Sequence, residues 1–203
     1  MKIICIGRNY INHAKELNNP IPEKPVIFLK PDTALVQNNK PFFYPDFSNE
    51  IHHEVEIVLK INRIGKHIEE RFAYRYFDEI GIGIDFTARD IQNEQRKNGL
   101  PWEIAKAFDH SAPISKFVKT SEFKNIRNLN FSLCLNNIIV QQGNTLDMIF
   151  SFDKIISYVS KFITLKIGDL IFTGTPAGVG PVKINDYLEA FIENNKMLDF
   201  YIK

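Results

Sequence analysis

Ile51-His-His-Glu-Val-Glu-Ile-Val-Leu59 has the alternating pattern of a β-strand with one buried face. Successive side chains of a strand point to opposite faces, so every second residue from Val55 to Leu59 lies on one face, and Glu54 and Glu56 lie on the other. The apolar face is expected to pack on a core. Two carboxylates this close repel each other unless solvent or a cation compensates them. The pattern therefore indicates either a solvated strand face or a cation site.

A second strand is predicted in Gly81-Ile-Gly-Ile-Asp-Phe-Thr87, whose large apolar residues fall on one face. The two glycines, Asp85 and Thr87 fall on the other face. Glycine weakens the interior of a strand, so glycines beside an acid indicate close approach of a ligand or of another backbone. A bulge or a bend is the alternative explanation.

Three carboxylates from these two strands, Glu54, Glu56 and Asp85, would form a site of hard oxygen ligands open to water and substrate. Such ligands suit Mg²⁺ or Mn²⁺ better than zinc or copper. The neighbouring histidines could add nitrogen ligands. His52 shares the face of the two glutamates and could support the metal ligands through hydrogen bonds, whereas His53 points to the opposite face, where packing is expected.

The rest of the chain contains more strand-like runs than helical ones, and the two kinds rarely alternate. The predicted strands are Val26–Leu29, Ile51–Ile61, Ile80–Phe86, Phe131–Leu135, Ile138–Gln141, Leu170–Phe172, Tyr187–Glu193 and Met197–Ile202. The predicted hairpin turns are Asn136-Asn137 and Asn194-Asn195. The predicted helices are Asn12–Leu17, Glu69–Phe77, Ala88–Lys97 and Phe152–Ile163. This content predicts a mostly β fold with peripheral helices (α+β), arranged as a mostly antiparallel β-roll or barrel rather than a doubly wound sheet.

Capping signals mark the ends of two of these helices. Ser151 is the predicted N-cap of the last helix. Thr87 and Asp90 have the spacing of a capping box at the start of the third helix, and Gly99 is placed to end it. The third helix therefore has the best-defined boundaries.

Composition limits the classes of function. The chain of 203 residues is 44% hydrophobic and 24% charged, enough for one sizeable core, so we expect a single domain over residues 1–203. The net charge is +1 and the basic residues are scattered, which argues against a nucleic-acid partner. No stretch approaches the roughly 20 apolar residues of a membrane span. Cys5 and Cys134 are expected to be small buried hydrophobes, and they suit a reducing compartment such as the cytoplasm.

Five blocks of sequence carry most of the polar residues with chemical potential. They are Gly7-Arg-Asn-Tyr-Ile-Asn-His-Ala-Lys-Glu16, His53-Glu-Val-Glu56, Asp85-Phe-Thr-Ala-Arg-Asp-Ile-Gln92, Trp102-Glu-Ile-Ala-Lys-Ala-Phe-Asp109 and Thr173-Gly-Thr-Pro-Ala-Gly-Val-Gly180. In order and spacing they resemble the fumarylacetoacetate hydrolase family over nearly the whole chain, most closely its small single-domain branch of acylpyruvases and oxaloacetate decarboxylases. The resemblance implies the mixed β-roll or barrel of that family and a two-fold homodimer.

By this resemblance, Glu54, Glu56 and Asp85 match the family's metal ligands, in agreement with the strand pattern. His13 and Glu16 match a catalytic pair on a short mobile lid helix. Their spacing of three places both on one helical face, where the glutamate can orient and polarise the imidazole. The alternative for this pair is a hydrogen bond on the surface of a helix.

The resemblance also assigns residues to the substrate pocket. Lys106 matches a catalytic lysine, whose ammonium would stabilise developing negative charge. The substrate-binding positions are Arg8, Arg89, Gln92 and Thr175. Arg89 and Gln92 lie at the start of a helix, and Thr175 lies in a Gly-rich loop whose N–H groups can bind a carboxylate. Pairing of Arg89 with a core carboxylate such as Asp109 stays open.

The function implied by the resemblance is an Mg²⁺- or Mn²⁺-dependent enzyme that acts on a small 2-oxo acid through an enolate. Acylpyruvate hydrolysis would use water activated by His13 and Glu16, whereas oxaloacetate decarboxylation needs no attacking water. The alternatives on the same site are a keto-enol tautomerase and a 2-hydroxyhepta-2,4-diene-1,7-dioate isomerase. An alternative of a different class is a non-catalytic protein that binds metal or 2-oxo acid. The lid pair argues against that class, because a binding protein needs no base.

Overall fold

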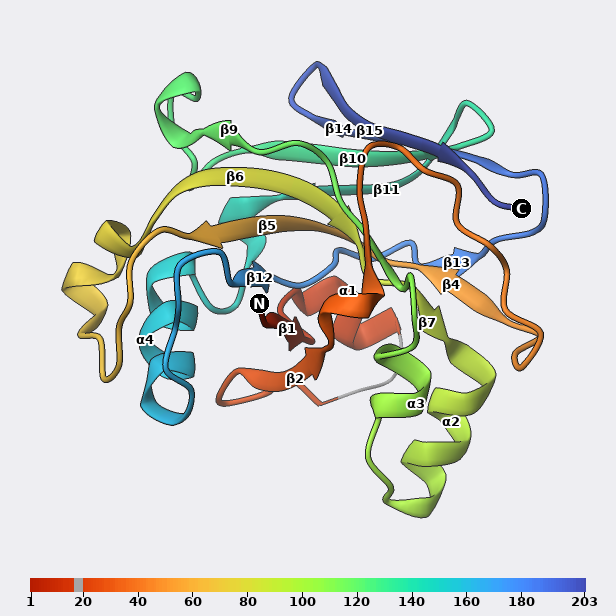
Figure 1. Cartoon of the computed structure of the whole chain (residues 1–203), viewed down its shortest axis with the longest axis horizontal. Coiled ribbons are helices and arrows are strands. Elements are labelled where there is room, and N and C mark those ends of the chain that lie inside the picture. The colour runs from red at the N-terminus through yellow and green to blue at the C-terminus, as the bar shows by residue number, and fades with distance from the viewer. Residues whose placement is uncertain (17–19) are drawn as a thin grey trace.

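Two long antiparallel strands, β5 (Val55–Ile61) and β6 (Phe77–Ile84), cross the centre of the molecule. The computed structural model describes residues 1–16 and 20–203. The sheet that contains both strands has the order β2-β1-β12-β5-β6-β9, and Figure 1 shows β5 and β6 curving across it. Its other strands are β1 (Ile3–Gly7), β2 (Val26–Lys30), β9 (Val118–Lys119) and β12 (Leu170–Phe172). In this sheet β1 pairs with β12 in parallel, and the other neighbouring strands pair antiparallel.

A second sheet, of order β11-β10-β14-β15, packs on the side of β5 and β6 away from β1 (Figure 1). Its strands are β10 (Asn130–Leu135), β11 (Ile138–Asn144), β14 (Tyr187–Ile192) and β15 (Asn195–Tyr201). The predicted turn at Asn136-Asn137 is confirmed, with φ angles of 51° and 66° that asparagine tolerates. The other turn is one residue earlier than predicted, because Asn195 already belongs to a strand.

Both central strands break at the same level, where the chain passes into a small sheet of order β13-β4-β7. The strands of this sheet are β4 (Ile51–His53), β7 (Thr87–Ala88) and β13 (Gly180–Pro181). The predicted single strand Ile51–Ile61 is therefore wrong: it is two strands in different sheets, interrupted at Glu54. The amide of Asp85 donates to the carbonyl oxygen of Glu54 at 2.8 Å. We call the point where β4 meets β5 and β6 meets β7 the corner. The backbones of Glu54 and Asp85, two of the predicted site residues, are hydrogen-bonded there.

Both faces of the central sheet are buried, but by different clusters of side chains. The predicted apolar face, with Ile57 and Ile82, belongs to the main core that the second sheet covers. The opposite face carries Val58 and a smaller cluster around Phe172. The face that holds Glu54 is therefore not a solvated strand surface.

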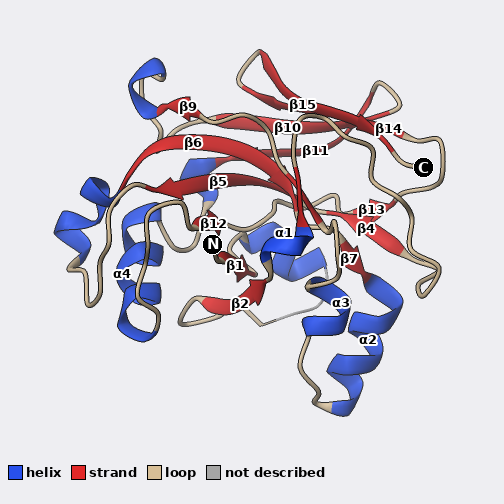
Figure 2. Ribbon diagram, viewed as in Figure 1, coloured by secondary structure: helices blue, strands red, loops and turns tan. Residues whose placement is uncertain are grey.

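The helices lie at the periphery of the sheets, as Figure 2 shows, so the predicted mostly β fold with peripheral helices is confirmed. They are α1 (Ile11–Glu16), α2 (Arg89–Asn98), α3 (Glu103–Lys106) and α4 (Phe152–Phe162). A further parallel pair joins β3 (Leu35–Val36) to β8 (Ala112–Pro113). The helix predicted at Asn12–Leu17 begins one residue earlier, and Leu17 lies outside the described residues. The segment Glu70–Tyr76 is helical as predicted, but in the 3₁₀ form.

The two predicted helix caps have different outcomes. Ser151 accepts a hydrogen bond from the amide of Lys154 at 3.3 Å and is the N-cap of α4, as predicted. The capping box at the start of α2 is wrong, because the N-cap is Ala88 and the hydroxyl of Thr87 donates to Glu54 instead. Gly99 ends α2 as predicted, with a left-handed φ of 65°. Among the helices described, none is both long enough and apolar enough to cross a membrane.

Candidate metal centre and active site

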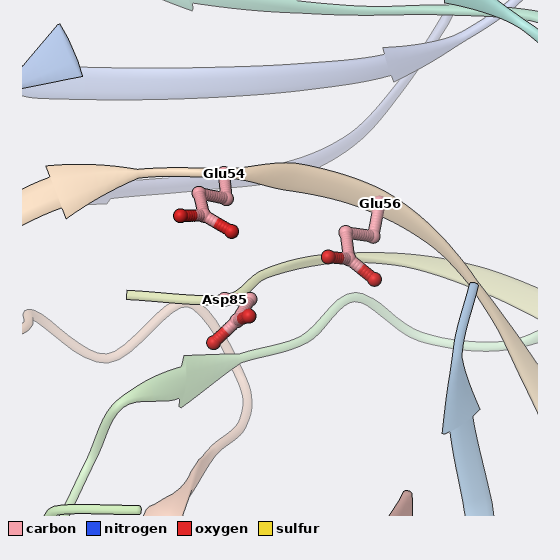
Figure 3. Close-up of side chains that lie close together, drawn as sticks. All are labelled: Glu54, Glu56 and Asp85. Atoms are coloured by element: carbon pink, nitrogen blue, oxygen red, sulfur yellow. The ribbon is translucent and has the colours of Figure 1, made fainter. Parts of the chain in front are cut away.

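Three carboxylates meet at the corner where the central strands break. Glu54 lies between β4 and β5, Glu56 lies within β5, and Asp85 directly follows β6. One oxygen from each lies within 4.8 Å of the others, and Figure 3 shows both glutamates extending from one strand toward the side that holds Asp85. Their exposed fractions are only 5%, 2% and 1%, respectively. Buried carboxylates this close require compensating positive charge.

Glu54 is compensated by two cations. Arg89 Nη2 donates to Glu54 Oε1 at 2.5 Å, and Lys106 Nζ donates to Oε2 at 2.9 Å. The hydroxyl of Thr87 also donates to Oε1 at 2.9 Å. Burial raises the pKa of Glu54, but the charges of Lys106 and Arg89 outweigh burial and hold the pKa below its usual range. Glu54 is therefore an anion whose position is fixed from both sides.

Glu56 is held by the backbone of the Gly-rich loop. The amide of Gly174 donates to Glu56 Oε2 at 2.7 Å. A side chain at Gly174 would be strained at φ 105° and would place its Cβ 2.6 Å from the Cβ of Asn9, so this contact requires glycine. Burial and then the charge of Asp85 raise the pKa of Glu56 well above its usual value. Glu56 is thus the least compensated of the three, and a bound cation would lower its pKa.

Asp85 lies between two lysines. Lys106 Nζ donates to Asp85 Oδ2 at 2.6 Å, and Lys30 Nζ lies 2.8 Å from Oδ1. The Lys30 contact lacks hydrogen-bond geometry, so Oδ1 has no hydrogen-bond partner among the residues that the structure describes. A buried carboxylate oxygen without such a partner, beside two other carboxylates, fits a ligand of a hard divalent cation.

Lys30 is a fully buried lysine that the sequence pattern did not identify. Its Nζ donates to Ser111 Oγ at 2.9 Å, to the carbonyl oxygens of Ser111 and Phe86 at 3.3 Å, and to the carbonyl oxygen of Lys106. It thereby ties the residue after Asp85 to the end of α3. A lysine at the end of an apolar strand is its one sequence signal, and that signal specifies no partner.

Lys106 lies at the end of α3, where its side chain is 4% exposed. Burial lowers the pKa of Lys106, but the charges of Asp85 and Glu54 outweigh burial and raise the pKa above its usual value. The side chain is therefore an ammonium that bridges two of the clustered carboxylates.

His13 and Glu16 are together on α1, as their spacing predicts. His13 Nδ1 lies 3.4 Å from Glu16 Oε2, and the amide of Gly178 donates to both carboxylate oxygens of Glu16 at 3.1 and 3.2 Å. Burial lowers the pKa of His13, and the opposing effects of Glu54 and Glu16 are smaller. The imidazole is consequently neutral at pH 7 and able to accept a proton.

Arg89 forms a hydrogen-bonded group at the start of α2. Besides Glu54, its guanidinium donates to Gln92 Oε1, and Nε donates to Nδ1 of His52 at 3.4 Å. The core carboxylate that it pairs with is therefore Glu54, and not the exposed Asp109. In the part of the chain that the structure describes, His52 is connected to the carboxylate cluster through its contact with Arg89.

Thr175 and His53 are connected by Gln141, another buried residue that the sequence pattern missed. Gln141 Nε2 donates to Thr175 Oγ1 at 2.8 Å. Gln141 Oε1 accepts from the amide of Val55 at 3.0 Å and lies 2.9 Å from His53 Nδ1. Thr175 thus lies beside the site, whereas His53 packs behind it. Since Gln141 is on β11 in the other sheet, no local sequence signal could reveal these contacts.

The predicted site residues line one cavity, with the exception of Glu16. Glu16 contacts His13, which does line the cavity. The cavity is lined by Ile6, Gly7, Arg8, His13, Phe28, Glu54, Glu56, Asp85, Arg89, Gln92, Arg96, Trp102, Lys106 and Thr175. Arg8 lies at the cavity with its guanidinium 5.7 Å from the centre of the Trp102 ring. The cavity also contains residues that were not predicted as site residues, among them Phe28, Arg96 and Trp102.

The two glycines of β6 have a different explanation from the predicted approach of a ligand. A Cβ at Gly83 would lie 2.6 Å from the ring of Phe172, and one at Gly81 would lie 3.0 Å from Ser115 Oγ. These glycines make room for neighbouring protein side chains. At Gly83 a Cβ would also lie 3.1 Å from the carbonyl oxygen of Pro113, so the predicted close approach of another backbone is confirmed there. The ligand interpretation of the glycine pattern is therefore wrong, although Asp85 on the same face does line the cavity.

Comparison with known proteins places this geometry in a family context. A family model described as "Fumarylacetoacetate (FAA) hydrolase C-terminal" matches residues 2–201. The chain is 44% identical over 201 residues to the mitochondrial oxaloacetate tautomerase FAHD1 of Mus musculus, covering 99% of this chain and 91% of that protein. It is 41% identical over 197 residues to the oxaloacetate tautomerase YcgM of Escherichia coli (strain K12), covering 97% of this chain and 90% of that protein.

A solved structure is similar over the whole chain. The fumarylpyruvate hydrolase from Pseudomonas aeruginosa, in complex with Mn²⁺ and pyruvate, superposes with a TM-score of 0.94 at 35% sequence identity. The match covers 100% of this chain and 89% of that one. Sequence similarity and structural similarity therefore both extend over nearly the whole chain.

Proposed function

Because the chain belongs to the fumarylacetoacetate hydrolase family, we propose that it is a divalent-metal-dependent enzyme that acts on small 2-oxo acids through an enolate. The observation that carries this proposal is the cluster of three buried carboxylates beside a buried ammonium, in which one carboxylate oxygen has no hydrogen-bond partner within residues 1–16 and 20–203. Similarity to proteins named as oxaloacetate tautomerases and to a fumarylpyruvate hydrolase supports the same class of substrate.

The proposed ion is Mg²⁺ or Mn²⁺, held by Glu54, Glu56 and Asp85, because an all-oxygen set of carboxylates favours hard cations. Bound there, the ion would act as a Lewis acid on the oxygens of the substrate's carboxylate and 2-oxo group. The Mn²⁺ in the similar fumarylpyruvate hydrolase structure supports manganese as one choice.

The chain's own residues would complete the binding and stabilise the charge that develops. The Lys106 ammonium would donate to the oxygen that becomes negative as the enolate forms. Thr175 Oγ1 already accepts a hydrogen bond from Gln141, so its own proton is available to a substrate carboxylate. Arg89 and Gln92 would act at the wall of the cavity, where Arg89 also fixes Glu54.

His13 is the proposed base, with Glu16 orienting it. In acylpyruvate hydrolysis, neutral His13 would take a proton from the water that attacks the distal carbonyl carbon. In oxaloacetate decarboxylation, loss of CO₂ forms the enolate without an attacking water. Keto-enol tautomerisation is the second candidate, favoured by the names of the relatives, and it needs a base to move a proton between carbon and oxygen.

The test is an assay of the purified protein on acylpyruvates, oxaloacetate and unsaturated dioates, with added Mg²⁺ or Mn²⁺. His13→Ala should lower acylpyruvate hydrolysis by about a hundredfold, the usual contribution of a general base, and leave oxaloacetate decarboxylation within about threefold. Asn12→Ala, exposed on the same helix, is the matched control and should change neither rate. Full activity in excess chelator would contradict the metal proposal, and equal losses in both reactions would contradict the role of His13.

The remaining expectations stay predictions. They are a single domain over residues 1–203, a two-fold homodimer, a cytoplasmic location, and no nucleic-acid or membrane partner.

A further inference from the structure

Gln141 is a buried amide of β11 whose hydrogen-bonding groups are all used by the protein. The residue is 1% exposed. Oε1 accepts from the amide of Val55 at 3.0 Å and lies 2.9 Å from His53 Nδ1. Nε2 donates to Thr175 Oγ1 at 2.8 Å and to the carbonyl oxygen of Pro176 at 3.0 Å. A glutamine amide offers two acceptor positions and two N–H donors, so these four contacts use its full capacity.

Two of these partners are backbone groups, and they fix the orientation of the Gln141 amide. The amide of Val55 can only donate, and the carbonyl oxygen of Pro176 can only accept. A 180° rotation of the side-chain amide would oppose two donors at one end and two acceptors at the other. Nε2 must therefore face Thr175, whose hydroxyl oxygen accepts from it. The proton of that hydroxyl is directed away from Gln141, and Thr175 lines the cavity.

A β-bulge in β11 places Gln141 beside the Gly-rich loop (residues 173–180). The register of β10 and β11 shifts next to the pair Leu133–Gln141, which makes Val140 the extra residue of β11. Bulges redirect side chains and are frequent beside active sites. The backbone of the loop lies directly on the bulge, because a Cβ at Gly178 would be 2.3 Å from the carbonyl oxygen of Val140. The loop that carries Thr175 is thus held against β11 at the bulge.

We infer that Gln141 is a positioning residue, which holds the hydroxyl of Thr175 as a hydrogen-bond donor to the ligand. The inference rests on the proposed function, in which Thr175 binds the carboxylate of a 2-oxo acid. A hydroxyl can rotate and either donate or accept, and an accepting hydroxyl would direct its lone pairs at the carboxylate. The hydrogen bond from Nε2 prevents this, because it occupies a lone pair of Oγ1 and leaves the proton on the cavity side. Gln141 therefore acts on the ligand through Thr175.

The test measures the contribution of Thr175 to pyruvate affinity with and without Gln141. Affinities for the Mn²⁺-loaded protein are measured by isothermal titration calorimetry, so no turnover is required. In the wild type, Thr175→Val should weaken pyruvate binding by about tenfold, the loss expected for one hydrogen bond to a charged group. Thr175→Ser keeps the hydroxyl and should stay within about twofold of the wild type. In Gln141→Met the hydroxyl is free to rotate, so adding Thr175→Val should cost less than about threefold.

A second variant covers the case in which Gln141→Met is poorly folded, since methionine leaves the amide of Val55 without its acceptor. Gln141→Glu keeps that acceptor, and the donors at Val55 and His53 favour its ionised form. Its other oxygen would accept the proton of Thr175, which would no longer donate to the ligand. Adding Thr175→Val to Gln141→Glu should therefore change pyruvate affinity by less than about twofold.

Gln142→Met is the matched control, since Gln142 is the exposed neighbour of Gln141 on β11. It should preserve both the pyruvate affinity and the contribution of Thr175. The inference would be overturned by an equal Thr175→Val loss with and without Gln141, by no loss in the wild type, or by loss of the Thr175 contribution in Gln142→Met. A fall in Mn²⁺ affinity in Gln141→Met as large as its fall in pyruvate affinity would also overturn it, because Gln141 would then act through Val55 on the neighbouring metal ligands.

Binding and turnover separate this inference from the proposed function. A protein whose Thr175 contribution depends on Gln141, but which turns over none of the assayed substrates, would contradict the proposed function alone. A protein that turns over these substrates, but loses the same pyruvate affinity on Thr175→Val with and without Gln141, would contradict the role of Gln141 alone.

Discussion

Lys30 and Asp85 form an ion pair with almost no contact with solvent. The side chains are 0% and 1% exposed, and Nζ lies 2.8 Å from Oδ1. Removing one partner of such a pair is costly, because the remaining charge stays buried without compensation. Lys30 therefore contributes to the site by making an ionised Asp85 tolerable before any cation binds.

Replacement of Lys30 by methionine should lower the free energy of unfolding by about 3 kcal/mol, the lower end of the cost of breaking a buried pair. Excess Mn²⁺ should restore part of the loss, because a bound cation would compensate Asp85 in place of the ammonium. The measurement is urea denaturation with and without Mn²⁺. Lys60→Met, which breaks the partly exposed pair with Glu79, is the control and should cost less than about 1 kcal/mol. A Lys30→Met protein as stable as the wild type would contradict this role.

At the scale of residues, the strand period of two was enough to place Glu54, Glu56 and Asp85 on faces that meet. It could not reveal Lys30 or Gln141. Their partners are distant in sequence, and only the packing of β2 and β11 beside the corner brings them close. Periodicity describes the face on which a side chain lies, and it says nothing of which element covers that face.

Asp90, the residue after Arg89, anchors helix α2. Asp90 Oδ1 accepts from the hydroxyl of Ser48 at 2.7 Å, and Oδ2 accepts from the amide of Asn49 at 2.9 Å. Partial burial raises the pKa of Asp90, but these hydrogen bonds and one from the amide of Ile91 outweigh it and lower the pKa below 3.8. Asp90 thus ties α2 to the loop before β4, and so helps to position Arg89.

Asp90→Asn should lower the free energy of unfolding by about 1 kcal/mol at pH 7, as expected for charge-assisted hydrogen bonds at a partly exposed site. The folded pKa is depressed, so the wild-type advantage is fully present above the unfolded pKa near 3.8 and is lost as the pH falls through the folded pKa. Denaturation curves from pH 7 to pH 3 measure this difference. Glu94→Gln, exposed on the same helix, is the control, and a difference that persists unchanged to pH 3 would contradict the account.

At the scale of elements, sequence patterns predicted the types of structure better than their interruptions. The alternation of Ile51–Ile61 continues through Glu54, so nothing in it marks the change of sheet. Thr87 and Asp90 have the spacing of a capping box, but their side chains form tertiary contacts with Glu54 and with the loop at Ser48. The same two residues could form a capping box or tertiary contacts. The packing of segments that are distant in sequence determines which of the two forms.

At the scale of the whole molecule, the site lies at the end of the central sheet where β5 and β6 meet the small sheet. Both faces of the central sheet are buried. The main core covers one face, and the smaller cluster around Phe172 covers the other, so the carboxylates are largely removed from water. Desolvation makes an ionised Glu56 unfavourable in the protein alone and makes a cation bound there more favourable. The fold therefore gives up stability at Glu56, and a cation bound there would recover it.

The proposed metal centre is tested most directly by calorimetric titration of Mn²⁺ into the wild type, Glu56→Gln and Asp78→Asn. Glutamine keeps an acceptor for the amide of Gly174 and removes a buried like charge, so Glu56→Gln should unfold at the same temperature as the wild type or higher. It should nevertheless bind Mn²⁺ at least about tenfold more weakly, because one charged ligand is lost. Asp78→Asn, on the same strand pair but exposed, should bind like the wild type. Absence of Mn²⁺ binding by the wild type, or equal binding by Glu56→Gln, would contradict the metal centre.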